Sequence, residues 1–324
     1  SDCKRGRRSK KRIGIDMRNV FADEITRLAV KDKGIVLLSG DIGNRLFNDY
    51  KAVAANRFFN CGVAEANMIG MSTGMALCGL RPVAYTIAPF ITTRCLEQIR
   101  VDVCYHNVPV IIVGVGAGFS YAALGATHHS GEDIAFLRAI PNMHVVCPGD
   151  PVEVRLALRA AIDLKKPVYL RLGKKGEPIV HDTSPDFQIG RVITISEGDD
   201  VCLISTGNIL PVVVKAAEEL DRIGLSAQIV SCHTVKPLDL EFLGFAFSRF
   251  QLVVTIEEHS RIGGLGGSVA EWFTDQPLLN AKLHRIGTSD LFLHEVGNQA
   301  YVRQRFGLTA SAISKQVVRK LGQF

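Results

Sequence analysis

Two stretches of the chain combine side chains that could transfer protons or bind a ligand. Glu65 precedes a run to Leu80 that contains no charged residue and three glycines, so it stands at the start of a helix that we expect to be buried on nearly every side. A carboxylate therefore stands at the mouth of an apolar helix. Farther along, His128 and His129 follow the glycine-rich stretch 114–118, and imidazoles offer hydrogen bonds or acid/base groups near neutral pH.

Each of these features also has a plainer explanation. Glu65 could be a first-turn carboxylate favoured by the helix dipole, or the ion-pair partner of Arg57. The glycine-rich stretch is weak evidence for a dinucleotide, because G-x-G-x-G is permissive and no acidic residue follows at a ribose-binding position. A metal site is not predicted, since the neighbouring histidines lack further ligands at suitable spacing. On sequence pattern alone we favour the plainer explanations for Glu65, whereas a functional role is favoured for His128.

A second glycine-rich stretch, 263–267, follows Glu257, Glu258 and His259. An anion could bind at the start of the helix that this stretch opens. Glycines there also permit a strand and a helix to pack closely, and we weight that explanation more heavily. No ordering of Ser, His and Asp, or of Cys and His, suggests a hydrolase.

The composition indicates a soluble globular protein with room for two domains. The 324 residues are 47% hydrophobic and 22% charged, with a formal net charge of +6. Seven basic residues within positions 1–12 account for this charge, because +6 less seven leaves −1 for the rest. The basic run has no apolar period, so we expect a solvated, disordered tail and do not predict nucleic-acid binding.

The cysteine pattern and the hydropathy indicate the cellular compartment. The eight cysteines include no C-x-x-C pair, which favours reduced thiols that pack as small hydrophobic side chains. No run of about 18 apolar residues and no hydrophobic signal region is present, so no membrane association is expected. These features predict a cytoplasmic location.

Strands and helices alternate along residues 13–175, which predicts a parallel sheet with right-handed crossovers. Ligands of such sheets bind beyond the carboxyl ends of the strands. Polar or glycine-rich segments are expected to converge there, namely Asp41, the residues after Asn60, the residues after Ile87, Gly114 to Ser130, and Arg171.

A change in composition separates this region from a second one. Residues 176–190 are expected to be a linker, because the stretch from Gly173 to Gly190 is rich in Lys, Gly, Pro, Asp and Ser and has no sustained apolar period. The alternation resumes over 191–324. The predicted fold class is therefore α/β, with two tandem domains that each contain a mostly parallel sheet flanked by helices.

Several motifs in order resemble the pyrimidine-binding domain and then the C-terminal domain of transketolase-type thiamine diphosphate enzymes. They are Ser39-Gly40-Asp41-Ile42-Gly43, Gly62-Val63-Ala64-Glu65-Ala66-Asn67-Met68, Gly79-Leu80-Arg81-Pro82-Val83, Thr127-His128-His129-Ser130, Cys147-Pro148-Gly149-Asp150, Val235-Lys236-Pro237-Leu238-Asp239 and Glu257-Glu258-His259 with the glycines that follow. The resemblance runs from about Ile15 to the end of the chain. The family's diphosphate-binding domain, with its Gly-Asp-Gly motif, has no counterpart here, so the chain is similar to the C-terminal subunit of a split transketolase.

The resemblance implies a role for each matching position. Glu65 would hydrogen-bond the aminopyrimidine ring nitrogen of thiamine diphosphate, and His128 would act at a substrate oxygen; these two are the candidate catalytic residues. Phe90 would stack on the pyrimidine, with Asp41 and Ile87 as further cofactor contacts. The cations expected to bind a sugar phosphate are Arg18, Lys174 and, in a neighbouring loop, Arg45.

Two departures from the family pattern concern the substrate. Leu124 stands where ordinary transketolases carry an Asp, and Gly116 stands where they carry a His. Losing two polar contacts should relax or redirect selectivity among sugars. The implied activity is transfer of a two-carbon ketol unit between sugars in an α2β2 assembly, with Mg²⁺ held mainly by an N-terminal partner subunit.

Three alternatives remain. The chain could be the β subunit of a 2-oxo acid dehydrogenase E1 component, although the Glu-Glu-His-Ser and Thr-His-His strings favour transketolase. A 1-deoxyxylulose-5-phosphate synthase-like reaction is disfavoured, because that family carries its first domain on the same chain. A non-catalytic binding subunit would keep the fold without turnover.

Overall fold

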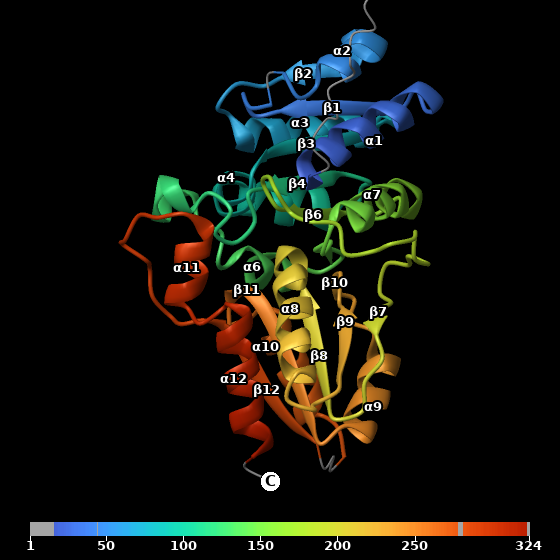
Figure 1. Cartoon of the computed structure of the whole chain (residues 1–324). Helices are drawn as coiled ribbons and strands as arrows, with labels where there is room; N and C mark the ends of the chain where they lie inside the picture. Colours follow the sequence, from blue (N-terminus) through green and yellow to red (C-terminus); the bar gives the residue numbers. More distant parts are fainter. Residues whose placement is uncertain (1–15, 44, 278–280, 323–324) are drawn as a thin grey trace, which may run out of the picture.

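Two β-sheets, each flanked by helices, organise the chain (Figure 1). The computed structural model describes residues 16–43, 45–277 and 281–322. The predicted basic tail, residues 1–12, lies outside the described residues. The predicted fold class is confirmed, since both sheets are mostly parallel and both carry helices.

The first sheet has seven strands in the order β10-β5-β6-β4-β3-β1-β2. Their bounds are β1 Ile35–Ser39, β2 Phe58–Asn60, β3 Arg81–Ile87, β4 Ile111–Val115, β5 His144–Val146, β6 Val168–Leu172 and β10 Thr234–Lys236. Strands β1, β4 and β6 are buried along their whole length, which explains their nearly continuous apolar sequences. All neighbours pair in parallel except β10, which runs antiparallel to β5.

Helices cover this sheet and connect its strands. They are α1 Met17–Lys31, α2 Asn48–Ala54, α3 Glu65–Leu77, α4 Ala88–Thr92, α5 Leu96–Gln98, α6 Asp133–Arg138 and α7 Pro151–Leu164. Side chains cap the two longest: Asp16 accepts from Asn19 N at the start of α1, and Asp150 accepts from Glu153 N at the start of α7.

The sequence pattern predicts one helix over residues 92–106, and this prediction is wrong. The segment is divided into the end of α4, a 3₁₀ turn, α5 and a π-helix over Ile99–Tyr105. Hydroxyls at the division bond back to the preceding turn: Thr92 Oγ1 donates to Ala88 O at 2.7 Å and Thr93 Oγ1 to Pro89 O at 2.6 Å. Such back-bonding bends helices, and an apolar period does not report it.

The second sheet has five strands in the order β12-β11-β8-β9-β7. The strands are β7 Ile193–Ser196, β8 Val201–Thr206, β9 Ala227–Ser231, β11 Leu252–Ser260 and β12 Lys282–Thr288; β7 is antiparallel to β9. The helices are α8 Leu210–Asp221, α9 Leu240–Arg249, α10 Leu265–Thr274, α11 Gln299–Arg305 and α12 Ala310–Leu321. None of the described helices is long and apolar enough to cross a membrane.

Strand β10 joins the two halves of the chain, and in Figure 1 it lies between the two units. It follows the predicted linker in sequence, yet it completes the first sheet by pairing Thr234 with Val146 and Lys236 with Val145. One hydrophobic core also spans both units, since it contains Val145 together with Cys202 and Val230. The two units therefore share a sheet edge and a core.

Candidate active site

The expected convergence of loops follows from the strand order of the first sheet. Strands β2, β1, β3, β4 and β6 are neighbours and run in parallel, so their carboxyl ends lie along one edge. Four of the predicted site residues, Asp41, Glu65, Phe90 and Lys174, follow β1, β2, β3 and β6. The contacts described below show which side chains meet there.

Glu65 is the first residue of α3 and is 2% exposed. Its Oε2 accepts a hydrogen bond from Arg94 Nη1 at 2.7 Å, and the Arg94 side chain is 45% exposed. Arg57, the partner suggested by sequence proximity, instead donates to the carbonyls of Ala29, Asp32 and Ile35. The alternative explanation that pairs Glu65 with Arg57 is therefore wrong.

Arg94 links Glu65 to the ring of Phe90. The guanidinium carbon lies 4.4 Å from the centroid of the Phe90 ring, a cation–π distance. A flat cation is thus stacked on an aromatic face while it donates an N–H to a buried carboxylate. Sequence reasoning missed Arg94; the signal available was a cation four residues after Phe90, on the same segment.

His128 lies beside Phe90, at the end of a 3₁₀ turn over Ala126–His128. The two ring centroids are 5.1 Å apart in an edge-to-face arrangement, and Nδ1 of His128 is 3.0 Å from Thr127 Oγ1. Partial burial lowers the pKa of His128, so the imidazole is neutral at pH 7. A neutral imidazole can both donate and accept a hydrogen bond.

Asp41 is paired with Asn60 at the ends of β1 and β2. Asn60 Nδ2 donates to Asp41 Oδ1 at 2.9 Å, and Asn60 Oδ1 accepts from the backbone N–H groups of Asp41 and Gly62. Asp41 has a φ of +56°, a strained conformation that clusters at functional sites. The pair sets the path of the chain into α3. Ile87, the last residue of β3, is half-buried next to the start of α4.

The structure places Lys174 over an aromatic ring and the start of α1, which carries Arg18, beside the segment of Lys174, since Met17 Sδ accepts from Gly173 N at 3.3 Å. Lys174 Nζ lies 4.4 Å from the centroid of the Tyr121 ring. Burial raises the pKa of Tyr121, and the nearby charge of Arg18 acts in the opposite direction. Arg18 Nε is buried and has no hydrogen-bond partner among the described residues. Arg45 lies apart in an exposed turn before α2.

The two positions that depart from the family pattern have different surroundings. Leu124 is 52% exposed at the end of a 3₁₀ turn over Ala122–Leu124. Gly116 has a φ of +86°, and a Cβ added there would lie 2.0 Å from Cδ2 of Tyr121. The space beside Gly116 is therefore occupied by the Tyr121 ring.

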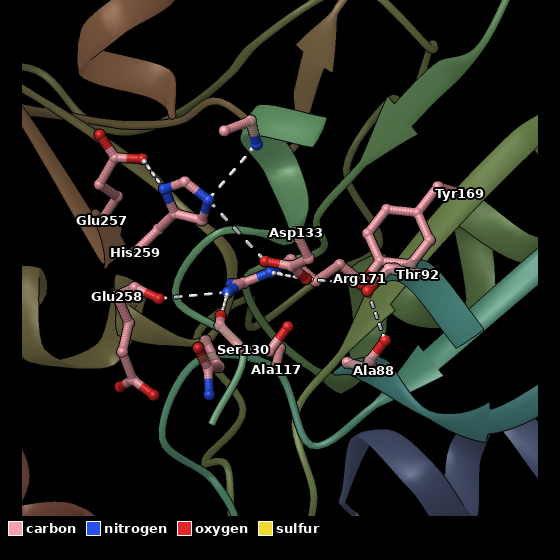
Figure 2. Close-up of polar contacts among 12 residues, drawn as sticks. Ala88, Thr92, Ala117, Ser130, Asp133, Tyr169, Arg171, Glu257, Glu258 and His259 are labelled. Atoms are coloured by element: carbon pink, nitrogen blue, oxygen red, sulfur yellow. Dashed lines mark hydrogen bonds and ion pairs between the residues drawn. The ribbon is translucent and has the colours of Figure 1, made fainter. Parts of the chain in front are cut away.

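A buried polar network lies between the two units (Figure 2). Arg171 is the penultimate residue of β6 and so lies at the carboxyl end of that strand, as expected, but it is only 1% exposed. Its Nε donates to Asp133 Oδ2 at 2.8 Å, and its Nη2 donates to the carbonyls of Ser130 and Glu258. Although burial opposes ionisation of Asp133, the adjacent Arg171 holds the pKa of this carboxyl below its usual value.

Glu258 anchors the glycine-rich loop to the second unit. Its Oε1 accepts from Phe119 N at 2.7 Å and from Gln299 Nε2 at 2.8 Å, and its Oε2 accepts from Arg303. A Cβ at Gly118 would lie 2.5 Å from Glu258 Oε1, so this close approach requires glycine. The loop that carries Tyr121 and His128 is thus held in position by this network, which lies behind it.

The second glycine-rich stretch is capped by the chain's own carboxylate. Glu257 accepts from Leu265 N at 2.7 Å and from Gly266 N at 2.8 Å, at the start of α10. Burial raises the pKa of Glu257 to about 7 and lowers the pKa of the neighbouring His259 to about 4. Glu257 therefore occupies the place of the anion considered for this stretch, in agreement with the packing explanation.

Comparison with known families identifies the chain. Residues 13–177 match the transketolase pyrimidine-binding domain, and residues 190–313 match the transketolase C-terminal domain. These matches cover most of the chain and follow the two sheets in order. The chain therefore belongs to the transketolase family, as the motifs predict.

Individual relatives are themselves parts of split enzymes. A putative transketolase C-terminal section from Methanocaldococcus jannaschii is 36% identical over 94% of this chain and 96% of that protein. One subunit of an apulose-4-phosphate transketolase from Phocaeicola vulgatus is 34% identical, with coverages of 93% and 96%. A solved structure described as a split gene transketolase in an inactive beta4 tetramer has 33% identity and a TM-score of 0.86, covering 95% of this chain and 99% of that one.

Proposed function

We propose that this chain is the C-terminal subunit of a split, thiamine diphosphate-dependent transketolase that transfers a two-carbon ketol unit from a ketose or ketose phosphate to an aldose acceptor. The contact of Glu65, Arg94 and Phe90 carries the proposal. A buried carboxylate and an aromatic face meet at the edge of the sheet, where the family places the aminopyrimidine ring. A non-catalytic subunit would need neither the buried carboxylate nor the aromatic face, so it does not account for their meeting at this edge.

The residues present fit the pyrimidine half of the cofactor. The guanidinium of Arg94 is a planar cation that donates an N–H to Glu65 and lies over the Phe90 ring. An aminopyrimidine is also planar and, once its ring nitrogen is protonated, also donates an N–H to a carboxylate; the half-exposed Arg94 side chain would move aside for it. Bound thiamine diphosphate supplies the carbanion chemistry of the reaction. Glu65 would hold a proton at the ring nitrogen, and Phe90 would orient the ring.

The remaining predicted residues are assigned to contacts with the substrate and with the cofactor. Neutral His128, next to Phe90, would donate a hydrogen bond to a substrate oxygen or accept its proton. Asp41, fixed by Asn60, would line the cofactor beside Ile87. These assignments require that the cofactor enter between the loops of β1 and β3.

Mg²⁺ and the diphosphate group are assigned to the partner subunit. Among the described residues, one group has the spacing of a metal site, formed by Asp150, Glu153 and His181. Its oxygens already accept hydrogen bonds: Asp150 Oδ2 from Val180 N and His181 N, and Glu153 Oε1 from His181 Nε2 at 2.8 Å. These bonds tie the linker to α7 and leave the group satisfied without a cation.

An exposed face of α3 supports association with a further chain. The sequence predicts burial on nearly every side, but this is wrong for the single chain: Val63 before the helix is 73% exposed and Leu77 is 62% exposed. Gly70 and Gly74, four residues apart, have no heavy atom within 4 Å of an added Cβ. Small residues of this spacing allow a second backbone to approach closely. We propose that subunits of an α2β2 assembly cover this face.

The substrate is proposed to carry a terminal anion. Arg18 Nε is a buried donor without a partner among the described residues. The ammonium of Lys174 lies over the ring of Tyr121. A phosphate would satisfy both cations, as in the substrate for which the Phocaeicola vulgatus relative is named. Leu124 and Gly116 offer no polar side chain to a sugar hydroxyl, so we expect selectivity that differs from the usual pentose phosphates. A role for Arg45 stays a prediction.

A cytoplasmic location is also proposed. The described cysteines, 61, 78, 95, 104, 147, 202 and 232, form no disulfide. Burial raises the pKa of the Cys95, Cys104 and Cys147 thiols to about 12, which keeps them protonated and unreactive. Reduced, buried thiols suit a reducing compartment.

The test is reconstitution with the N-terminal subunit, thiamine diphosphate and Mg²⁺, followed by a screen of ketose donors and aldose acceptors. Glu65→Gln should lower turnover at least about 100-fold, because it removes the proton held at the cofactor. The matched control is Glu97→Gln, which changes a glutamate on α5 outside the site. Full activity of Glu65→Gln, or no ketol transfer by the wild-type complex, would refute the proposed function. Normal efficiency on xylulose 5-phosphate with ribose 5-phosphate would refute altered selectivity alone.

A further inference from the structure

The ring of Tyr121 takes the place of a side chain at position 116. Gly116 follows β4 with a φ of +86°, and a Cβ built there would lie 2.0 Å from Cδ2 and 2.1 Å from Cε2 of Tyr121. Packed atoms do not approach so closely, so no side chain fits between this ring and the backbone. The two positions act as one unit, in which glycine at 116 makes room for the aromatic ring at 121.

Tyr121 contacts groups from both parts of the candidate site. The ammonium of Lys174 lies 4.4 Å from its ring centroid, within the range of a cation–π interaction. The His128 ring lies 6.3 Å away, centroid to centroid, with the planes at 60°. The tyrosine therefore connects the imidazole assigned to a substrate oxygen with the cation assigned to the terminal anion.

The surroundings of Tyr121 indicate a ligand. Arg18 follows Met17, whose Sδ accepts from Gly173 N at 3.3 Å, so the start of α1 lies beside the segment that carries Lys174. Nε of Arg18 is buried without a partner among the residues that the structure describes. Buried donors are usually paired, and this one lies beside the segment of a second cation, so an oxyanion bound there would accept from it. A tetrahedral oxyanion would satisfy Arg18 and Lys174 together, with Tyr121 beside both.

We propose that Tyr121 is a specificity-determining residue: its ring holds the Lys174 ammonium and forms an apolar wall along the carbon chain between the reacting carbonyl and a terminal phosphate or sulfonate. This inference rests on the proposed transketolase function, and it concerns recognition of the substrate's carbon chain and terminal anion. An apolar wall offers no hydrogen-bond partner to a hydroxyl on that carbon chain, so the site does not strongly select for substrates that carry this hydroxyl. The preferred class is therefore anionic sugars that need no hydroxyl on the carbons between the reacting carbonyl and the carbon that bears the anion.

The experiment uses the reconstituted complex with the N-terminal subunit. Calorimetric titration with inorganic phosphate measures the anion site without turnover. Tyr121→Ala should weaken phosphate binding about fivefold, because Lys174 loses the ring that holds it, whereas Tyr121→Phe should stay within about twofold. Tyr105→Ala, which removes a tyrosine that is 81% exposed, is the control and should match the wild type. Unchanged phosphate affinity in Tyr121→Ala would overturn the proposal.

Kinetics on two donors supply a second readout. For xylulose 5-phosphate, Tyr121→Ala should lower kcat/KM at least about tenfold more than for hydroxypyruvate, a short donor without phosphate, since the anion is the group affected. An equal loss on both donors would indicate a merely structural role and overturn the proposal. Circular dichroism confirms that the variant is folded. Absence of turnover on every donor would sink the proposed function, while the phosphate titration would still decide the role of Tyr121.

A double variant isolates the contact itself. Lys174→Met removes the ammonium, so adding Tyr121→Ala to it should cause no further loss of phosphate affinity. Fully additive losses would show that Tyr121 does not act through Lys174 and would contradict the inference. Binding of both single variants is measured in the same buffer, because phosphate affinity depends on ionic strength.

Discussion

Two ion pairs in this protein have almost the same length and very different surroundings. Arg171 donates to Asp133 at 2.8 Å, and Arg94 donates to Glu65 at 2.7 Å. The first pair is 1% and 0% exposed, between the two units, whereas Arg94 of the second pair is 45% exposed. Each of the two arginines is thus bonded to a buried carboxylate, but only Arg94 can exchange its partner for another molecule.

The difference separates structural polar groups from functional ones. Around Arg171, both units supply hydrogen-bond partners: Tyr169 donates to the same Asp133 oxygen, and Glu258 accepts from Phe119 N, although Nη1 of Arg171 and Oδ1 of Asp133 have no partner among the described residues. Around Glu65, the neighbours are a half-exposed arginine, an aromatic face and the exposed surface of α3. A site that must receive a ligand is left open, while the support behind it is closed.

The largest effect is expected from breaking the closed pair. Arg171→Met should reduce the free energy of unfolding by about 3–5 kcal/mol, because Asp133 is left as an uncompensated buried charge. Urea unfolding of the purified subunit measures it. The double variant Arg171→Met with Asp133→Leu is the control and should recover most of the loss. A loss below about 1 kcal/mol in the single variant would contradict the contrast between the pairs.

The next effect concerns the open site. Because the diphosphate-binding part is assigned to the partner, this subunit alone should bind thiamine diphosphate at least about 100-fold more weakly than the complex, a difference of about 2.7 kcal/mol. Calorimetry with Mg²⁺ present compares the two. Tight binding by the subunit alone would show that the open edge is complete without a partner.

The closed network should also respond to pH through Glu257. Its folded pKa of about 7 lies above the ordinary value of 4.5, so the folded state retains a proton that the unfolded state releases between these values. Stability relative to Glu257→Gln should therefore be greatest below pH 4.5 and fall by about 3 kcal/mol as pH rises to about 8. Thermal unfolding of both proteins across this range is the measurement. A difference that grows with pH would have the wrong sign.

The smallest effect is expected from the open pair. Arg94→Met should cost about 1–2 kcal/mol of stability: Glu65 is left as a buried carboxyl group, but the half-exposed position of Arg94 lets water reach it. Urea unfolding beside Arg171→Met gives a direct comparison. A loss as large as that of Arg171→Met would mean that Arg94 is a structural residue and does not leave Glu65.

Much of the architecture is readable from local sequence. The apolar runs of β1 and β4 are buried on both faces, and Pro151 after the capping Asp150 marks the start of α7. The order of motifs predicts the family and the approximate division of the chain. Short edge elements such as β7 and β10 escape prediction, because three or four residues carry too little periodicity.

The candidate site shows the same division between local and distant information. Motifs single out Phe90 and His128, and the structure places their rings together. Motifs do not single out Arg94 and Tyr121, because their importance depends on residues far away in sequence, Glu65 for one and Lys174 for the other. The burial of Arg171 is hidden for the same reason, since its partner Asp133 is 38 residues away.

The position of β10 in the sequence affects how the protein folds while it is being synthesised. Val146 emerges from the ribosome long before Thr234, so the edge of β5 has no partner while about ninety further residues are being added. During that interval the unpaired edge is open to other chains, including those on neighbouring ribosomes. Completion of the first sheet therefore waits for the second half of the polypeptide, and truncation before Lys236 should yield a nascent product that aggregates.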